Sequence, residues 1–419
     1  MSTTKKAPEI RFKGFSGEWE ECPLSKFISS LDAGVSVNSG GNPAGEGEFG
    51  ILKTSCVTNG VFDPSENKVV SDSLEINRLK EPVLKNTIII SRMNTPALVG
   101  ANAYIDRSYS NYFLPDRLWT AKPTTSGDLQ FIANILGSAK GREALSGLAT
   151  GTSGSMKNIS KPSVLELKFH VPKDPEQTQI GNTFQKLDSL INQHQQKHDK
   201  LSSIKKAMLE KMFPKPGETV PQIRFKGFSG EWEESSLFEE TIVSTGFPFD
   251  SSDFCGSGNL LVITNGNIQN SSSAVNGKVG NRIANEKVDL LNQYALNIGD
   301  ILVTMDGSVG RTAKVIEPNQ ILAQRVGRLV AKNNTEFLYQ SLNTGAFLDG
   351  MTTISHGGTI KHISLSEIGS YRLLVPDNLE EQEKIGNYLK KLDTLINQHQ
   401  QQITKLTHIK QACLSKMFV

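Results

Sequence analysis

Two stretches of the chain carry apolar residues at alternating spacings of four and three, the pattern of a helix with a coiled-coil seam. The first runs from Ile180 to Phe213 and the second from Ile385 to Phe418. Capping groups precede both, at Asp174–Gln177 in the first and at Asn378 and Glu381 in the second. The residues expected in the seam are Ile180, Phe184, Leu187, Ile191, His194 and Leu201 of the first helix and Ile385, Leu389, Leu392, Ile396, His399 and Leu406 of the second.

These two helix-forming stretches are copies of each other, and other segments repeat in the same order. The sequence PEIRFKGFSGEWEE, from Pro8 to Glu21 (the first anchor), returns with one substitution from Pro221 to Glu234 (the second anchor). A weaker echo links GSMKNIS, which starts at Gly154, to GTIKHIS, which starts at Gly358. Two copies are too few for a solenoid, so the sequence indicates a duplicated domain pair with divergent domains between the anchors.

The topology of the chain predicts how the two helices pair. Each helix would be about 55 Å long at 1.5 Å per residue, and neither would stay single with its seam exposed. Because the second domain connects the end of the first helix to the start of the second, antiparallel pairing is favoured. We therefore expect an α/β (α+β) fold with a pseudo-two-fold repeat, in which globular domains at 1–173 and 215–377 lie at opposite ends of helices at 174–214 and 378–419.

The middle of the seam turns polar at His194 and His399, which occupy equivalent positions in the repeated NQHQQ. A polar layer can fix the register of a helix pair, so we expect these two side chains to face each other. A metal site is the alternative, because His198 follows His194 at a ligand spacing. Ile403 replaces this second histidine in the other copy, which weakens the metal alternative.

Each domain contains a buried-strand run, at Thr87–Ser91 and at Asp300–Met305, followed by turns rich in Gly, Asn and Ser. Polar loops held by strands can pair with base edges and phosphates, although most such residues are ordinary turn residues. Arg117 and Arg325 are equivalent across the repeat, which favours a structural or phosphate-contacting role because base-reading residues should differ. The candidate DNA-binding residues are Lys53, Asn59, Arg92, Asn94, Thr95, Arg117, Thr152, Ser153 and Lys157 in the first domain and Asn265, Asn267, Asp306, Ser308, Arg311, Arg325, His356, Thr359 and Lys361 in the second.

Composition sets broad limits on the class of protein. A chain of 419 residues with 37% hydrophobic and 21% charged residues suits two globular units with connecting elements. A net charge of +2 neither indicates nor excludes nucleic acid. Four dispersed cysteines without a CxxC pair favour reduced thiols and no zinc site. The absence of a signal peptide or an apolar run of about 18 residues predicts a cytoplasmic protein.

The anchors, the segment GDILVTMDGSVGR (Gly299–Arg311) and GTIKHIS…VP before a long I-G-x-x-L-x-x-L-D helix resemble the DNA specificity subunits of type I restriction–modification systems over nearly the whole chain. The resemblance implies two target-recognition domains that each bind one half of a split, asymmetric site on double-stranded DNA. It also implies that the repeated helices form a spacer and that, with the domains, they dock two modification subunits carrying the adenine methyltransferase, with motor-nuclease subunits joining for restriction. It implies no catalytic residue, metal or cofactor in this chain.

Motifs of the partner enzymes are absent from the sequence. NPAG at Asn42–Gly45 lacks the aromatic residue with which an adenine methyltransferase stacks on a flipped base, and no GxxxxGK[ST] phosphate loop is present. Pro376–Asp377 with Glu383–Lys384 faintly resembles a nuclease motif, but a capping role at a helix start is favoured. Two other classes stay open: a stand-alone sequence-specific DNA-binding regulator, and a scaffold whose domains bind protein.

Overall fold

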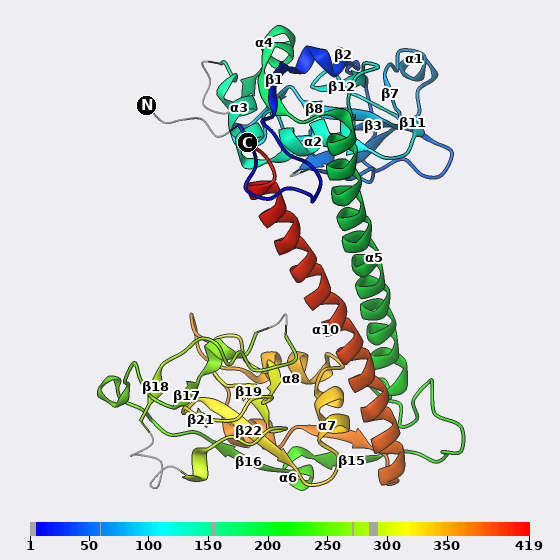
Figure 1. Cartoon of the computed structure of the whole chain (residues 1–419). Coiled ribbons are helices and arrows are strands. Elements are labelled where there is room, and N and C mark those ends of the chain that lie inside the picture. The colour runs from blue at the N-terminus through cyan, green and yellow to red at the C-terminus, as the bar shows by residue number, and fades with distance from the viewer. Residues whose placement is uncertain (1–5, 59, 152–155, 270–271, 285–291) are drawn as a thin grey trace. The chain divides into compact units, whose positions relative to one another are not determined.

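The computed structural model describes residues 6–58, 60–151, 156–269, 272–284 and 292–419. The chain divides into two compact units, one made of 1–193 with 402–419 and the other of 194–401 (Figure 1). Each unit holds one α/β domain together with part of each long helix. None of the helices among the described residues combines the length and apolar character of a membrane span.

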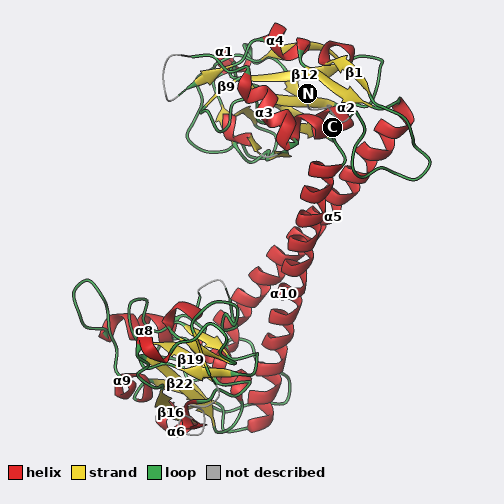
Figure 2. Ribbon diagram, turned by 60° about the vertical axis from the view of Figure 1, so that its left-hand side comes forward, coloured by secondary structure: helices red, strands yellow, loops and turns green. Residues whose placement is uncertain are grey.

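Both predicted long helices are present and continuous: α5 spans Asp174–Met212 and α10 spans Leu379–Lys416 (Figure 2). In the first unit the Lys410 ammonium of α10 donates to the Asp188 carboxylate of α5 over 2.6 Å. In the second unit Lys205 of α5 donates to Asp393 of α10, also over 2.6 Å. These ion pairs join early positions of one helix to late positions of the other, so the helices pack antiparallel, as the topology of the chain predicts.

The expected histidine contact lies in the second unit. The Nδ1 atoms of His194 and His399 are 2.9 Å apart and their ring centroids are 5.1 Å apart. One ring must therefore donate a hydrogen bond that the other accepts. Both side chains are half-buried, as are Ile191 and Ile396 nearby on the two helices.

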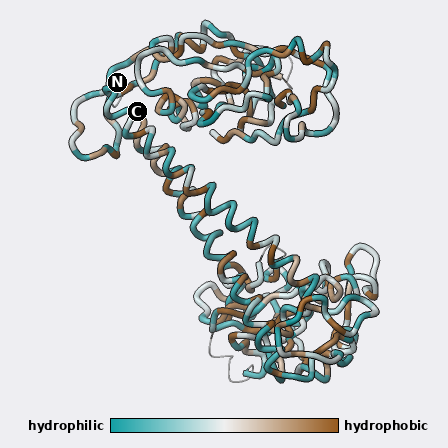
Figure 3. The backbone as a smooth tube through the Cα atoms, turned by 90° about the vertical axis from the view of Figure 1, so that its right-hand side faces the viewer, coloured by the Kyte–Doolittle hydropathy of each residue, from teal (hydrophilic) through white to brown (hydrophobic). Residues whose placement is uncertain are grey.

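Towards their ends the helices pack into the globular cores as well as on each other. Ile180 and Phe184 are 1% exposed, and the Phe184 ring stacks on Phe418 at 5.8 Å between centroids. Phe418 also packs on Phe131 of the domain, at 5.6 Å. In the second unit Ile385, Leu389 and Leu392 of α10 are buried in the domain core, with Leu201 of α5 partly buried against it. In Figure 3 the long helices are mostly hydrophilic in colour, and the hydrophobic colour is concentrated in the domains.

The first domain is built on two four-stranded sheets, of order β10-β8-β12-β2 and β6-β3-β11-β7, with three two-stranded pairs beside them. The buried-strand run predicted at Thr87–Ser91 is β8, all five residues of which are buried. The strands are β1 (Glu20–Pro23), β2 (Ile28–Ala33), β3 (Phe49–Leu52), β4 (Val57–Thr58), β5 (Val61–Phe62), β6 (Asn67–Val70), β7 (Pro82–Val83), β8 (Thr87–Ser91), β9 (Met93–Asn94), β10 (Asn102–Ile105), β11 (Tyr109–Phe113), β12 (Leu118–Pro123), β13 (Lys157–Asn158) and β14 (Lys168–Val171). The helices are α1 (Ser73–Ile76), α2 (Leu129–Gly137), α3 (Ala139–Gly147) and α4 (Lys161–Glu166), with short 3-10 turns η1 (Leu24–Lys26) and η2 (Thr54–Cys56).

The second domain repeats this plan although its sequence has diverged. Its sheets have the orders β16-β22-β19-β20 and β18-β17-β21, with β15 paired to β23 as β1 is paired to β14. The strands are β15 (Glu233–Ser236), β16 (Thr241–Thr245), β17 (Leu260–Ile263), β18 (Arg282–Ile283), β19 (Ile301–Thr304), β20 (Thr312–Lys314), β21 (Gln320–Leu322), β22 (Val326–Ala331) and β23 (Arg372–Val375). The helices are α6 (Leu237–Glu240), α7 (Thr335–Leu342), α8 (Ala346–Ile354) and α9 (Leu365–Gly369), with 3-10 turns η3 (Ser251–Asp253), η4 (Asn265–Asn267) and η6 (Asn292–Tyr294).

The two anchors bind the helix ends in the same way in both units. Arg11 makes two hydrogen bonds of 2.7 Å to the Glu176 carboxylate in the first turn of α5. Arg224 does the same to Glu381 of α10, at 2.6 and 2.7 Å. Both glutamates are buried, at 1% and 0% exposure. The Ile10 and Ile223 amides then donate to the carbonyls near the end of the other helix, so each anchor joins the two helices of its unit.

The predicted capping interactions differ from those in the structure. Asn378 does cap α10, because its side chain accepts from the Glu380 amide at 2.9 Å. Glu381 does not reach back to complete a capping box, since its carboxylate is held by Arg224. Gln177 likewise donates to the Pro172 carbonyl at 2.7 Å and accepts from the Asp128 amide at 3.1 Å. In the second copy, therefore, the charged partner in the anchor replaces the predicted local cap.

Candidate nucleic-acid interface

Each domain has a corner where the end of its central strand meets the KNIS or KHIS segment. The first corner comprises Arg92–Thr95, Arg117 and Lys157–Ile159, and the second corner comprises Met305–Arg311, Arg325 and His356–Ile363. In the first, the Arg92 amide donates to the Arg117 carbonyl, and the Arg92 carbonyl accepts from the Ile159 amide, both at 3.0 Å.

The same backbone frame recurs in the second corner. The Met305 amide donates to the Arg325 carbonyl at 3.3 Å, and the Met305 carbonyl accepts from the Ile363 amide at 2.9 Å. Met305 therefore takes the place of Arg92. The frame is shared by the two domains, while the side chain that it presents has changed from a cation to a buried apolar group.

The side chains of the first corner differ in their exposure and in their hydrogen bonds. Asn94 is 8% exposed. Its side-chain nitrogen donates to the Ser91 hydroxyl at 3.1 Å, and its side-chain oxygen accepts from the Thr95 backbone amide at 2.8 Å. The Lys157 ammonium donates to the Gly151 carbonyl at 2.9 Å. Arg117 and Thr95 are exposed. The buried Nε of Arg92 has no hydrogen-bond partner in the described part of the chain.

The second corner contains an ionic cluster. The Asp306 carboxylate accepts from His362 Nδ1 at 2.6 Å and from Arg325 at 2.9 Å. Burial raises the pKa of Asp306, but the hydrogen bonds from His362 and Arg325 lower it more, so the carboxyl stays ionised. Beside it, His356 Nε2 lies 3.0 Å from the Glu367 carboxylate.

Four other predicted residues of the second corner stay accessible or half-buried. Ser308, Thr359 and Lys361 are exposed, and Arg311 is half-buried. Neither Arg311 nor Lys361 has a carboxylate within ion-pair distance in the described ranges. Asn265 touches the corner, since its side-chain oxygen accepts from the Met305 amide at 3.3 Å.

Two predicted residues have side chains engaged elsewhere. Asn267 is 3% exposed, its oxygen accepts from Thr264, and its nitrogen donates to the Asn276 and Val279 carbonyls at 2.8 and 2.7 Å. The Asn267 side chain is therefore held within the turn that contains η4, and its assignment as a DNA contact stays a prediction. Lys53 precedes η2 and pairs with Glu66 at 3.6 Å. Asn59, Thr152 and Ser153 lie outside the described residues.

His362 lies at the centre of the second corner and is not among the residues predicted from the sequence. The signal was visible, because His362 and Asn158 are the differing residues of the repeated KHIS and KNIS segments. The antiparallel bridges between Asp306 and His362 and between His356 and His362 explain why this position joins the strand end to the following loop.

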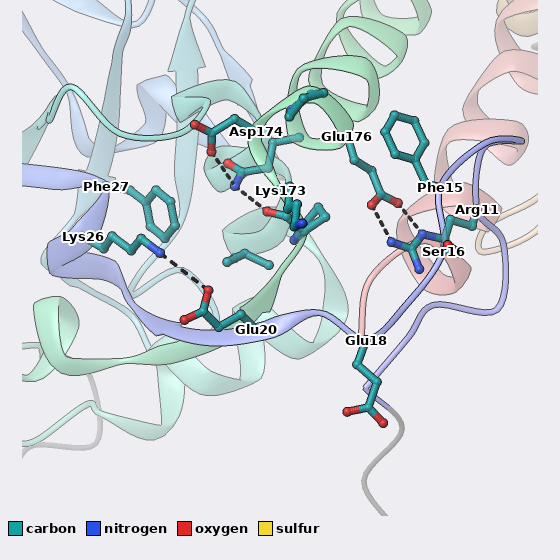
Figure 4. A pocket seen from close by; sticks show the side chains of 14 residues that line it. Arg11, Phe15, Ser16, Glu18, Glu20, Lys26, Phe27, Lys173, Asp174 and Glu176 are labelled. Carbon is teal, nitrogen blue, oxygen red and sulfur yellow. Dashed lines mark hydrogen bonds and ion pairs between the residues drawn. The ribbon is translucent and has the colours of Figure 1, made fainter.

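A cavity of about 530 Å³ lies at the start of α5, away from both corners in sequence, and is lined mainly by first-anchor and helix-start residues (Figure 4). Figure 4 shows Arg11 and Glu176 joined at one side, with Lys26 near Glu20 at the other. Its anchor lining, which includes Arg11, Phe15, Ser16 and Glu18, recurs residue for residue in the second anchor.

The family model for the type I restriction modification DNA specificity domain matches the chain twice, over residues 17–203 and 230–408. The chain belongs to this family. The two matches cover both domains and most of both long helices, so the resemblance expected from the anchors and the helix motif is confirmed.

Two relatives give the extent of the similarity. The type I restriction enzyme MjaVIII specificity subunit of Methanocaldococcus jannaschii is 26% identical over 267 residues, which is 59% of this chain. The matched region spans 61% of the length of that relative. The crystal structure of the type I restriction–modification S subunit from M. genitalium aligns with a TM-score of 0.65 and 18% identity over 99% of each chain, so the two share a fold.

Proposed function

We propose that this chain is the sequence-specificity subunit of a type I restriction–modification complex and that each domain reads one half of a bipartite, asymmetric DNA site. The observation that carries the proposal is the corner that occurs twice with the same backbone frame and different side chains. A frame that repeats keeps its orientation towards the DNA, while different side chains at equivalent positions suit different bases.

Within each corner the shared and the divergent positions suit different contacts. Arg117 and Arg325 are exposed and equivalent, so we assign them to phosphates. Arg311 has no cationic counterpart in the first domain. The Arg311 carbonyl accepts from the Thr304 amide just as the Ala101 carbonyl accepts from the Ser91 amide, so Ala101 is the equivalent residue. We assign Arg311 to a base edge, where a guanidinium pairs with guanine.

The parts that are duplicated closely suit two identical partners. The anchors and their Arg–Glu pairs recur almost unchanged, as does the anchor sequence lining the cavity in Figure 4, and the long helices are close copies of each other. We propose that these surfaces dock two modification subunits, and that motor-nuclease subunits join through the complex to restrict DNA. In this assignment 1–173 and 215–377 are the target-recognition domains, and 174–214 and 378–419 are the spacer helices.

The chemistry is proposed to belong to the partners. The chain supplies specificity and no catalytic residue or cofactor, whereas adenine methylation requires the methyltransferase of the modification subunit. The name of the Methanocaldococcus jannaschii relative, a specificity subunit of a type I restriction enzyme, supports this role.

Methyl transfer with and without a partner tests the proposal. The purified chain is incubated with S-adenosylmethionine and genomic DNA, alone and after addition of the modification subunit. We expect adenine methylation only in the mixture, and only at one bipartite sequence. Methylation by the chain alone would contradict the proposed division of roles. Tight site-specific binding by the chain alone, with no effect of the partner, would identify a stand-alone regulator instead.

A further inference from the structure

The turn between His356 and His362 presents an apolar side chain to solvent. Ile360 is 67% exposed, and its neighbours Thr359 and Lys361 are exposed polar residues. Single exposed apolar residues are common on protein surfaces, so exposure alone assigns nothing to this residue. The further evidence comes from the backbone that supports Ile360 and from the residues around it.

The backbone of the turn is held at both ends. The His356 and His362 backbones exchange hydrogen bonds of 3.0 and 2.8 Å, and the Gly307 amide donates to the Lys361 carbonyl at 2.8 Å. Gly357 adopts φ of 102°, and a Cβ there would lie 2.3 Å from the Ile360 carbonyl oxygen. The turn is therefore ordered before any ligand arrives, so binding through Ile360 requires little further loss of backbone entropy.

One cation beside Ile360 is not paired with a carboxylate in the described ranges. The Lys361 ammonium is exposed and has no such partner, whereas Arg325 and His362 pair with Asp306 and His356 pairs with Glu367. The first copy also has an apolar residue before its lysine, since Met156 precedes Lys157 where Ile360 precedes Lys361. The fitting partner has phosphates together with a small apolar group, and the thymine 5-methyl group is the apolar feature of the DNA major groove.

We propose that Ile360 is a specificity-determining residue that contacts the 5-methyl group of a thymine in the half-site read by the second domain. Lys361, next in the same turn, binds a neighbouring phosphate. This inference rests on the proposed function and adds one base contact to it.

Deoxyuridine substitution tests the contact, because it removes only the methyl group from thymine. Binding is measured with the chain assembled with its modification subunits, on duplexes of the methylated site in which each thymine is replaced singly. Ile360→Ala is compared with Ile298→Ala, because Ile298 is 66% exposed in the same domain and lies outside the second corner. The wild-type assembly is expected to lose roughly three- to ten-fold in affinity at one thymine, as for one buried methyl-sized group.

The losses of affinity caused by deoxyuridine and by Ile360→Ala should not be additive. Ile360→Ala should weaken binding to the unmodified site by a similar factor and make the assembly insensitive to deoxyuridine at that thymine. Ile360→Val, which keeps two methyl groups, should fall between wild type and Ile360→Ala, and Ile298→Ala should match wild type.

Three results would overturn the inference: equal binding by Ile360→Ala and Ile298→Ala, no thymine that responds in the wild type, or an unchanged deoxyuridine effect in Ile360→Ala. Failure of the proposed function is recognised separately, because the wild-type assembly would then show no preference for the bipartite site over a scrambled duplex.

Discussion

At the scale of single residues, the anchors depend on one arginine each. The Glu176 and Glu381 carboxylates are almost completely buried, and Arg11 and Arg224 each satisfy both oxygens of their partner. Burial of a carboxylate is unfavourable unless it is paired and hydrogen-bonded. These two contacts hold the start of each long helix against the anchor of the same unit.

Arg11→Ala should therefore destabilise the first unit strongly. The substitution leaves the Glu176 carboxylate buried without its partner, at a cost of roughly 3–5 kcal/mol in the free energy of unfolding. Hydrogen exchange in the first two turns of α5 should speed up accordingly. Arg372→Ala is the control, because the Arg372–Glu234 pair is more than half exposed on both sides and should contribute about 0–1 kcal/mol. Equal effects of the two variants would show that the anchor pair is not stabilising.

Arg311 and Arg325 should differ in how their loss affects DNA binding. Arg311→Ala should relax selectivity at one base pair, by roughly 1–3 kcal/mol, because its position differs between the two copies. Arg325→Ala should weaken binding to all sequences about equally and reduce the salt dependence. Competition binding of the assembled complex against single-base variants of the site separates the two results. Uniform weakening by Arg311→Ala would remove it from the base-reading residues.

Residue identities predicted these sites only in part. The repeat shows that Arg117 and Arg325 are equivalent. The partner of Arg11 lies 165 residues away in the chain, so no local sequence pattern predicts the pair. Asn267 looked like a loop residue, and only the fold shows that its amide is consumed by the backbone of its own turn.

At the scale of elements, the long helices were the most predictable part of the molecule. Their periodicity is a local property of the sequence, and α5 and α10 begin and end close to the expected residues. The sheet orders were not predictable, because strands such as β2 and β12 pair across about ninety intervening residues with no signal in either segment. The two Asp–Lys pairs and the His194–His399 contact join residues of one helix to residues of the other.

The histidine contact predicts a pH dependence of the helix pair. Burial lowers the pKa of His399, and repulsion by His194, Lys197 and His198 lowers it further. The folded state therefore binds fewer protons than the unfolded chain, so stability rises with pH and falls as pH drops through the ordinary histidine value of about 6.5. Hydrogen exchange at the middle of both helices, corrected for intrinsic rates, should be faster at about pH 5.5 than at about pH 7.5.

His399→Asn should remove most of this pH dependence, because asparagine does not titrate. His408→Asn, an exposed position on the same helix, is the matched control and should leave the dependence unchanged. A wild-type exchange rate that does not change with pH, or a dependence that survives His399→Asn, would show that the contact does not control pairing.

At the scale of the whole molecule, duplication and divergence divide the chain. The anchors, their Arg–Glu pairs and the helices have stayed alike, while the corners keep a common backbone frame and differ in side chains. This division is expected for a molecule that binds identical partners at two places and a different DNA sequence with each domain. The family, matched once in each half of the chain, agrees with that division.

Mapping of methylated adenines across the genome, with and without this gene, tests the central claim most directly. The account predicts that deletion abolishes methylation at one bipartite sequence whose two halves differ, and that re-expression of the chain restores it. An unchanged map, or the loss of a continuous or palindromic site in place of a split asymmetric one, would contradict the claim that two different domains each read one half.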